Sequence, residues 1–224
     1  MRKKAVIVIA AFNEEESLGR TLDLIKATRL PAQIILVNDG STDKTRAIAL
    51  AKGAQVIDMV DKTNQSKNRG KANAIFAGLR AALKFNPTSV VTLDADMLTV
   101  PRVSLKELID SAHTATRIGK IAMHVAPYAE GTFEPHTYLS GLRSFSIPAL
   151  HYLHKSKFKS IPRGYGLETF LGIFFSKFRQ NTKGSFQLEP GFRSSASKQH
   201  QKSDIALTRK RITKRFRPRF RLHV

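Results

Sequence analysis

In the first hundred residues, continuous hydrophobic runs alternate with longer segments in which hydrophobic residues recur at helical spacing. The runs are typical of strands buried on both faces, and they occupy residues 5–12, 33–39, 55–60 and 89–93. The periodic segments predict helices over residues 15–30 and 71–85, with a shorter helix that ends near residue 52. This alternation predicts an α/β fold with a mostly parallel sheet and helices on both of its faces.

The pattern weakens after residue 100. It predicts a helix over 105–115, a strand over 120–125 and two mixed segments at 141–153 and 166–178. From about residue 180 the chain becomes polar, and residues 205–224 combine many Lys and Arg with Ile, Leu and Phe. We therefore expect one domain over residues 1–180, followed by a basic C-terminal extension over 181–224.

Polar residues follow three of the predicted strands. Asn13 and Glu14 come after the first, Asp39 after the second, and Asp94 and Asp96 after the fourth. Ligands of parallel sheets bind outside the carboxyl ends of the strands, so these residues are expected to lie at one sheet edge. The sequence therefore predicts a binding site at that edge.

Asp94 and Asp96 are separated by one residue on an extended segment. Side chains at this spacing point the same way, so both carboxylates can approach one divalent cation. Oxygen ligands favour Mg²⁺ or Mn²⁺ over zinc. The chain contains no cysteine, which excludes disulfides, thiolate zinc sites and cysteine nucleophiles. The alternative interpretation is a polar loop with two solvated aspartates.

Two further polar segments have a structural and a functional interpretation. In residues 37–43 (VNDGSTD), turn and helix-cap chemistry explains the sequence, whereas a functional Asp39 would accept a hydrogen bond from a base N–H. Residues 68–71 (NRGK) precede a long helix, where basic side chains and free N–H groups can hold a diphosphate. A solvated charged turn explains this second segment equally well.

The chain resembles family-2 glycosyltransferases of the GT-A fold through four ordered segments: IVIAAFNEEE, IILVNDGSTDKT, NRGKANAIFAGLRAAL and VVTLDADM. Within that family it is most similar to the dolichyl-phosphate mannose synthase-like group. SGLRSF and RGYGLETFL extend the resemblance more loosely over residues 138–172. The resemblance implies a Rossmann-like GT-A domain, with a nucleotide-binding half over 1–100 and an acceptor half over 101–180. It also implies an enzyme that transfers a sugar from a nucleoside-diphosphate donor with inversion at the anomeric carbon.

The resemblance implies roles for the matching residues. Those implied to bind the nucleotide sugar are Phe12, Glu14, Val37, Asp39, Lys71, Asp94, Ala95 and Arg143. Among them, Asp39 would read the base, Lys71 would lie near the phosphates, and Arg143 would lie near a donor or acceptor phosphate. Asp94 and Asp96 would hold Mg²⁺ or Mn²⁺, and Asp96 is thereby counted as catalytic.

Glu168 is the general base that the resemblance implies. A lipid-phosphate acceptor already carries an anionic oxygen, and with such an acceptor Glu168 would orient groups instead. The sequence departs from the family pattern in two ways. Ala10 replaces the usual proline, which removes a rigid φ but no chemistry. Relatives with a C-terminal membrane anchor have hydrophobic helices there, whereas this chain ends in a basic segment. The seven histidines show no metal-ligand spacing. Some GT-A enzymes use a late histidine as a further metal ligand, and the resemblance makes His200 the candidate for that role.

The net charge of +21 is unevenly distributed. Residues 1–150 carry 20 basic and 14 acidic side chains, whereas 151–224 carry 18 and 3. The positive excess therefore belongs to the C-terminal third, and it favours anionic partners. We expect residues 198–224 to contact an anionic membrane surface, where Phe and Ile would enter the headgroup boundary. A solvated, disordered charge run is the alternative.

We expect a cytoplasmic protein, peripheral at the inner face of the cell membrane. The first hydrophobic run is short and leads into three glutamates, so we interpret it as a strand and not as a signal peptide. No run reaches the roughly 20 apolar residues that span a bilayer. The expected acceptor is a lipid phosphate or a lipid-linked or polysaccharide glycan, and a soluble glycan or metabolite is the alternative. A non-catalytic nucleic-acid-binding protein ranks lower, because no recognised nucleic-acid module accompanies the basic tail.

Overall fold

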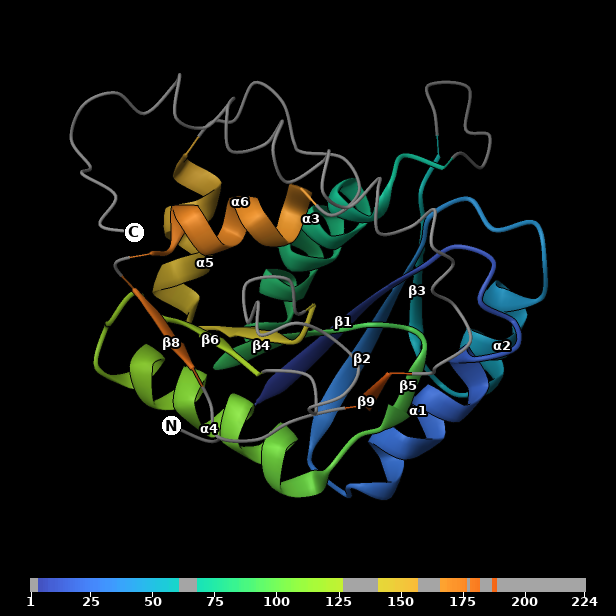
Figure 1. The fold of residues 1–224 in the computed structure, drawn as a ribbon, viewed down its shortest axis with the longest axis horizontal. Helices are drawn as coiled ribbons and strands as arrows, with labels where there is room; N and C mark the ends of the chain where they lie inside the picture. Colours follow the sequence, from blue (N-terminus) through green and yellow to red (C-terminus); the bar gives the residue numbers. More distant parts are fainter. Residues whose placement is uncertain are drawn as a thin grey trace.

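A central mixed sheet organises the computed structural model, which describes residues 4–60, 68–126, 141–156, 166–176, 178–181 and 187–188. Within these ranges the strands of this sheet are β1 (Ala5–Ala11), β2 (Ala32–Asn38), β3 (Gln55–Asp58), β4 (Ser89–Leu93), β6 (Met123–Val125), β7 (Arg143–Phe145) and β8 (Arg179–Asn181). They are ordered β3-β2-β1-β4-β7-β6-β8 (Figure 1). Strands β1 to β4 are parallel, as are β6 and β8, whereas β7 is antiparallel to both of its neighbours. The predicted mostly parallel sheet is confirmed.

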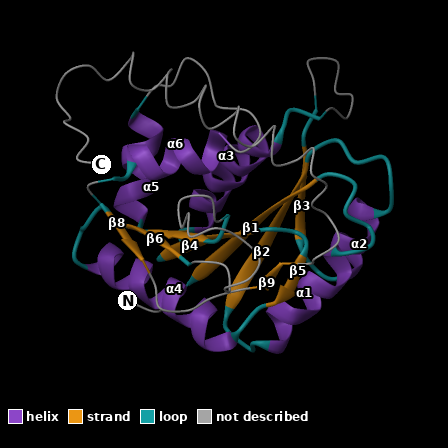
Figure 2. Cartoon of the chain, viewed as in Figure 1, coloured by secondary structure: helices purple, strands orange, loops and turns teal. Residues whose placement is uncertain are grey.

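Helices cover both faces of the sheet (Figure 2). One face packs against α1 (Leu18–Ala27), α2 (Thr45–Ala51) and α4 (Arg102–Arg117), and the other against α3 (Lys71–Ala82), α5 (Ile147–Lys155) and α6 (Gly166–Phe174). Successive residues of a strand point to opposite faces, so Ile7 and Ile9 enter the first core and Val6 and Val8 the second. This explains why β1 reads as an unbroken hydrophobic run.

Helix α3 lies very close to the sheet. A Cβ atom on Gly78 would come within 2.3 Å of a methyl carbon of Val8 and within 2.9 Å of one of Val37. Only glycine permits this approach without a shift of the helix. The close packing fixes the position of Lys71, the first residue of α3, over the carboxyl edge of the sheet.

Four of the short strands in the described residues were not predicted individually. Strand β7 formed within a mixed segment, and β5 (Met97–Thr99) pairs with β9 (Gln187–Leu188) in a separate two-stranded sheet. Both β9 and the last residue of β8, Asn181, lie beyond the boundary expected at residue 180. The pairing of β9 with β5 extends the folded domain into what composition alone assigned to the basic extension.

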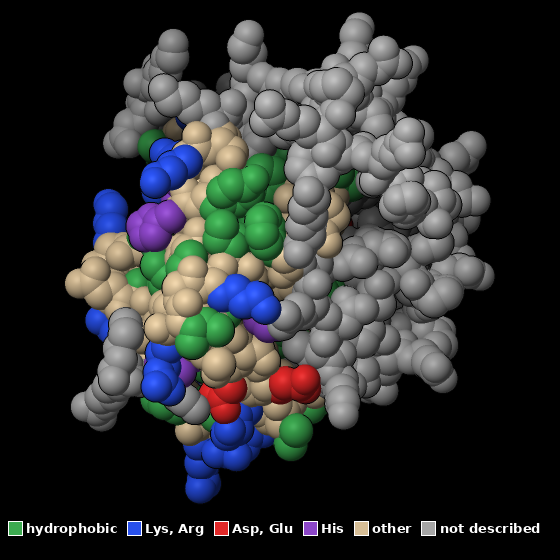
Figure 3. All heavy atoms as spheres, turned by 90° about the vertical axis from the view of Figure 1, so that its left-hand side faces the viewer, with side chains coloured by type: hydrophobic (Ala, Val, Ile, Leu, Met, Phe, Trp, Pro, Cys, Tyr) green, Lys and Arg blue, Asp and Glu red, His purple; other side chains and the backbone are tan. Residues whose placement is uncertain are grey.

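Aromatic side chains gather where α5 meets α6. The ring of Tyr152 lies 5.1 Å from that of Phe174 and 5.8 Å from that of Phe178, and Tyr152 is 38% exposed. Figure 3 shows hydrophobic side chains forming a patch on this side of the molecule, with Lys, Arg and His side chains around it. Among the described residues, no helix is both long enough and apolar enough to cross a bilayer.

Candidate active site

The strand order reverses at β1, which lies between β2 and β4. In open α/β sheets such a reversal separates the loops at the carboxyl ends of the two strands, and ligands bind there. The loop after β1 carries Glu14, and the loop after β4 carries Asp94 and Asp96. The predicted polar residues therefore meet at one edge of the sheet.

Lys71 connects two carboxylates that are distant in the sequence. Its Nζ lies 2.9 Å from Oδ1 of Asp94 and 3.2 Å from Oε1 of Glu168. Glu168 is in the first turn of α6 and only 1% exposed, whereas the Lys71 side chain is 38% exposed. Within the described residues, Oε2 of Glu168 accepts no hydrogen bond. One cation thus joins the loop after β4 to α6, and a buried carboxylate oxygen beside it retains its capacity to accept.

The Asp94 carboxylate packs directly on the backbone of Gly141. A Cβ on Gly141 would lie 2.4 Å from Oδ1 and 2.6 Å from Oδ2 of Asp94. Thr92 holds Gly141 in place, because its hydroxyl donates a 2.7 Å hydrogen bond to the Gly141 carbonyl. The sequence gives no signal for either contact of Gly141, since the hydrogen bond from Thr92 joins residues 49 positions apart.

The other side of the same loop is held by α1. The buried hydroxyl of Thr21 donates to the carbonyl of Ala95 at 2.7 Å and accepts from the N–H of Met97 at 2.9 Å. Sequence reasoning missed Thr21 as well, since a threonine on the buried face of an amphipathic helix is unremarkable by itself. The loop after β4 is therefore fixed from both sides of the sheet.

Asp39 is 2% exposed and accepts a 2.7 Å hydrogen bond from the backbone N–H of Arg69. Burial raises the pKa of Asp39, and hydrogen bonds from the N–H groups of Arg69 and Gly70 partly offset that rise. The carboxylate therefore links the end of β2 to the start of α3. It also lies beside Gly70, which directly precedes Lys71.

The loops after β1 and β2 are interlocked by hydrogen bonds. The Asn13 side-chain oxygen accepts from the N–H of Thr42 at 2.9 Å, and the Asn13 N–H donates to the Ser41 hydroxyl at 3.1 Å. The N–H of Glu14 donates to the Thr45 hydroxyl at 2.7 Å. These contacts explain the NEEE and GSTDKT segments structurally and hold both loops in one arrangement.

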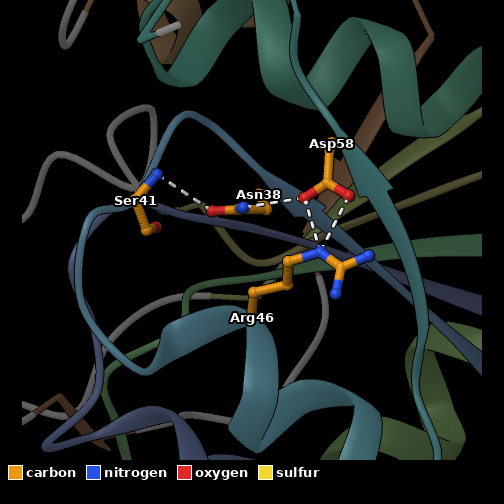
Figure 4. A network of polar contacts seen from close by, with 4 residues as sticks. All are labelled: Asn38, Ser41, Arg46 and Asp58. Atoms are coloured by element: carbon orange, nitrogen blue, oxygen red, sulfur yellow. Dashed lines mark hydrogen bonds and ion pairs between the residues drawn. The ribbon is translucent and has the colours of Figure 1, made fainter. Parts of the chain in front are cut away.

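A second network supports the end of β2 from the side of β3 (Figure 4). The Asn38 amide donates to Asp58 at 2.8 Å, and its oxygen accepts from the N–H of Ser41 at 3.1 Å. Arg46 of α2 forms an ion pair with Asp58 at 2.9 Å. Because Asn38 directly precedes Asp39, this network restrains the backbone from which Asp39 projects.

The remaining expected residues occupy different environments. Phe12 is 44% exposed at the sheet edge, whereas Val37 is fully buried with its side chain in the core against α3. Ala95 is buried between the two aspartates. The guanidinium of Arg143 is also buried, and its Nη2 lies 3.5 Å from the backbone carbonyl of Glu168. In this structure Arg143 therefore contacts the first turn of α6.

The donor set at the sheet edge fits Mg²⁺ or Mn²⁺. Asp94 and Asp96 supply two carboxylates, and Mg²⁺ is commonly held by one or two carboxylates plus substrate phosphates and water. In the described ranges, no three His, Cys, Asp or Glu side chains gather into a complete metal site. The pair alone thus suits a cation that arrives with a phosphate-bearing ligand. His200 and residues 198–224 lie outside the described residues.

The pKa of Glu14 is raised at this edge of the sheet. Burial raises its pKa, a 2.6 Å hydrogen bond from the Ser17 hydroxyl opposes the rise, and the charges of Asp96, Asp94 and Asp43 add to it. Three neighbouring carboxylates therefore act on Glu14, as expected of a site that attracts a cation.

Glu14→Gln is expected to stabilise the metal-free protein at neutral pH. The pKa of Glu14 is raised in the folded state above its ordinary value of 4.5. The free energy of unfolding of the protein therefore falls as pH rises from 4.5 through the raised pKa. Glutamine removes this penalty and can still accept from Ser17. Urea denaturation should show a higher midpoint at neutral pH and no gain well below pH 4.5. Glu16→Gln, at an exposed position, is the control and should change the midpoint little; an equal gain in both variants would contradict the explanation.

Comparison with known proteins identifies the family. The family model described as Glycosyl transferase family 2 matches residues 6–181. A 4,4'-diaponeurosporenoate glycosyltransferase of Staphylococcus aureus is 33% identical over 126 residues, which cover 56% of this chain and 32% of that protein. An uncharacterised protein of Methanocaldococcus jannaschii is 30% identical over 164 residues, which cover 64% of this chain and 65% of that protein. The chain therefore spans less than two thirds of the length of either relative.

Solved structures agree with the fold. The glucosyl-3-phosphoglycerate synthase of Mycobacterium tuberculosis, in complex with Mn²⁺, UDP-glucose and phosphoglyceric acid, matches with a TM-score of 0.68 at 21% identity. The match covers 92% of this chain and 78% of that one. Another structure of the same synthase contains Mg²⁺ and UDP. Since the family model covers most of the chain, and the fold and the polar sheet edge agree with it, the chain belongs to glycosyl transferase family 2.

Proposed function

We propose that the chain is a metal-dependent, inverting glycosyltransferase that uses a nucleoside-diphosphate sugar. The observation that supports this most directly is the convergence of Lys71 with Asp94 and Glu168 at the strand-order reversal. A cation, a pair of metal-type carboxylates and a buried carboxylate are thereby placed at one sheet edge. These are the groups required to bind a diphosphate and to act on an attacking oxygen.

The donor side of the site would be formed by the two interlocked loops and the start of α3. Asp39 would accept from a base N–H, and the exposed ring of Phe12 would pack against the nucleotide. Lys71 would contact the phosphates, since its partly exposed ammonium already lies between acidic groups at the start of a helix. Ala95 and Val37 would contribute through their backbone, because their side chains are buried.

Asp94 and Asp96 would hold the divalent cation. When bound, Mg²⁺ or Mn²⁺ supplies Lewis-acid assistance to the departing diphosphate. The ion pair between Lys71 and Asp94 neutralises part of the negative charge of this edge. The negative charges of Asp96 and Asp94 also act on Glu14, whose pKa burial and these charges raise.

The acceptor side would be formed by Glu168 and Arg143. In an inverting transfer, the acceptor oxygen attacks the anomeric carbon as the bond to the diphosphate breaks. Glu168 is the proposed general base for a hydroxyl acceptor, and its Oε2 has capacity to accept that proton. For a phosphate acceptor the attacking oxygen is already anionic, so Glu168 would instead orient Lys71. Arg143 would support Glu168 from the backbone side.

We further propose a lipid-phosphate or lipid-linked acceptor at an anionic membrane surface, as in the dolichyl-phosphate mannose synthase-like group. The excess positive charge of the C-terminal third supports this, as does the patch of hydrophobic and basic side chains near α5 (Figure 3). The runner-up is a soluble acceptor. It is favoured by the solved synthase, which was crystallised with phosphoglyceric acid.

Three assays test these proposals and their alternatives. A panel of UDP-, GDP- and dTDP-sugars with Mn²⁺ or Mg²⁺ should reveal hydrolysis or transfer with one donor, and chelation should abolish it. No turnover with any donor or acceptor would contradict the enzyme proposal. Flotation with anionic vesicles tests the membrane proposal separately, and a protein that stays unbound at physiological salt would favour the soluble acceptor.

Tight, salt-sensitive binding to nucleic acid that survives loss of Asp39 and Asp96 would support the polyanion-binding alternative.

Gly141→Ala should weaken metal and donor binding, because the new methyl group would occupy the space of the Asp94 carboxylate. We expect the concentration of Mn²⁺ that gives half-maximal turnover to rise about tenfold, as for other changes that displace a metal ligand. Gly19→Ala in α1 is the matched control, since a Cβ there would meet only Ile48 at 3.6 Å. An unchanged Mn²⁺ requirement in Gly141→Ala would contradict the placement of the metal beside Asp94.

A further inference from the structure

The hydroxyl of Thr21 holds the loop after β4 by two hydrogen bonds. Thr21 is the fourth residue of α1 and is fully buried. Its Oγ1 donates to the carbonyl of Ala95 at 2.7 Å and accepts from the N–H of Met97 at 2.9 Å. Neither group is used in the pairing of β4 with its neighbours, which ends before Asp94.

These two bonds bracket Asp96. The Ala95 carbonyl belongs to the peptide unit that enters Asp96, and the Met97 N–H belongs to the unit that leaves it. Holding both units restrains the backbone torsions of Asp96, and with them the direction of the Cα–Cβ bond from which its carboxylate projects. Asp94 is held separately by Lys71 and by its packing on Gly141. The separation of the two carboxylates therefore depends on Thr21 from one side and on Gly141 from the other.

We propose that Thr21 is a positioning residue that sets the direction of the Asp96 carboxylate toward the divalent cation. The inference rests on the proposed function of the same site. It assigns to α1 a part in the metal site through the backbone of the loop after β4. Support at this distance from a metal ligand commonly changes metal affinity about 10-fold to 100-fold.

Three variants separate positioning from packing. Thr21→Val keeps the shape of the side chain and removes the hydroxyl, whereas Thr21→Ser keeps the hydroxyl and removes the methyl group. Thr116→Val is the matched control: its hydroxyl also forms two bonds, donating to the Ala112 carbonyl at 2.9 Å and accepting from the Ile147 N–H at 3.0 Å. Thr116 joins α4 to α5, away from the site. Thr21→Ala serves as a second hydroxyl-free variant if Thr21→Val does not fold.

The measurement is Mn²⁺ binding in the presence of UDP, GDP or dTDP, each tested separately. Electron paramagnetic resonance of the free ion follows the binding. Thr21→Val should bind Mn²⁺ about 10-fold to 100-fold more weakly than wild type. Thr21→Ser should restore wild-type binding, and Thr116→Val should retain it despite a comparable loss of thermal stability. In turnover assays, Thr21→Val should raise the Mn²⁺ requirement much more than the donor KM measured at saturating Mn²⁺.

Each contrary result has a distinct meaning. Wild-type Mn²⁺ affinity in Thr21→Val, or equal weakening in Thr116→Val, would overturn the positioning role and leave the proposed function standing. Failure of Thr21→Ser to restore binding would also overturn it, because the methyl group would then be the important part. A wild-type protein that binds no Mn²⁺ in the presence of UDP, GDP or dTDP would overturn the proposed function and this inference with it.

Discussion

Asp96→Asn should lower kcat by about three orders of magnitude with the preferred donor. The change keeps the size of the side chain but removes the charge that would hold the cation, while Thr21 still fixes the loop. Losing about 4 kcal/mol of stabilisation of the departing diphosphate corresponds to roughly a thousandfold in rate. Steady-state turnover at several Mn²⁺ concentrations is the measurement.

Asp110→Asn is the control for this change. Asp110 forms an ion pair with Lys106 on α4, at 2.6 Å and one helical turn away, so its loss tests the general effect of removing a carboxylate. Turnover should stay near wild type in that variant. Full activity of Asp96→Asn at wild-type Mn²⁺ concentrations would show that Asp96 is not a metal ligand.

Lys71→Met should reduce both activity and stability. Its ammonium lies within 3.2 Å of Glu168, a carboxylate that is 1% exposed, and removing it leaves that charge without its ion-pair partner. Breaking a buried pair costs about 3–5 kcal/mol, but partial exposure of Lys71 reduces the expected loss to about 1–2 kcal/mol. Loss of a phosphate contact should lower kcat/KM at least about a hundredfold, equivalent to ~3 kcal/mol. Urea denaturation and initial-rate kinetics measure the two effects.

Lys52→Met provides the comparison for Lys71→Met. Lys52 pairs with Asp23 on the surface at 2.5 Å, where both side chains are partly exposed, and such pairs contribute about 0–1 kcal/mol. In a Glu168→Gln background, the stability cost of Lys71→Met should shrink, since the buried charge has already been removed. Equal losses in both backgrounds would show that Lys71 and Glu168 are not energetically coupled.

The N-terminal half of the fold could be predicted because its strands are hydrophobic runs, and the neighbouring strands β1 and β4 are almost wholly buried. The run at 89–93 coincides with β4, and that at 5–12 exceeds β1 by one residue. Helix α4 proved longer than expected at both ends, spanning Arg102–Arg117, since its hydrophobic stripe marks only the middle. Where hydrophobic burial alone determines an element, sequence pattern locates it.

The later strands could not be placed in the same way. Strand β7 has three residues, and its position depends on pairing with β4, some fifty residues earlier in the chain. Strand β9 has two residues, and only its partner β5 gives it a structure. Short elements of this kind carry too little periodicity to be distinguished from loops.

The residues of the candidate site also fall into those that could be predicted from the sequence and those that could not. Its charged members, such as Lys71 and Asp94, were expected from polar residues at strand and helix ends, and the structure brings these two within 2.9 Å. Gly141 and Thr21 were not expected, because each acts by a contact with a residue far along the chain. A buried threonine or a glycine has no local pattern that distinguishes support of a loop from ordinary packing.

Asn13 shows how narrowly one position of the interlocked loops is constrained. Its φ of 55° lies in the left-handed region, which only Gly, Asn and Asp adopt at low cost. Glycine would lose the side-chain oxygen that accepts from Thr42. Aspartate would keep an acceptor but add another negative charge beside Glu14, whose pKa is already raised by burial and by its acidic neighbours. Asparagine is thus the one residue that satisfies the backbone, the loop contact and the charge balance together, so natural variation at this position should be nearly absent.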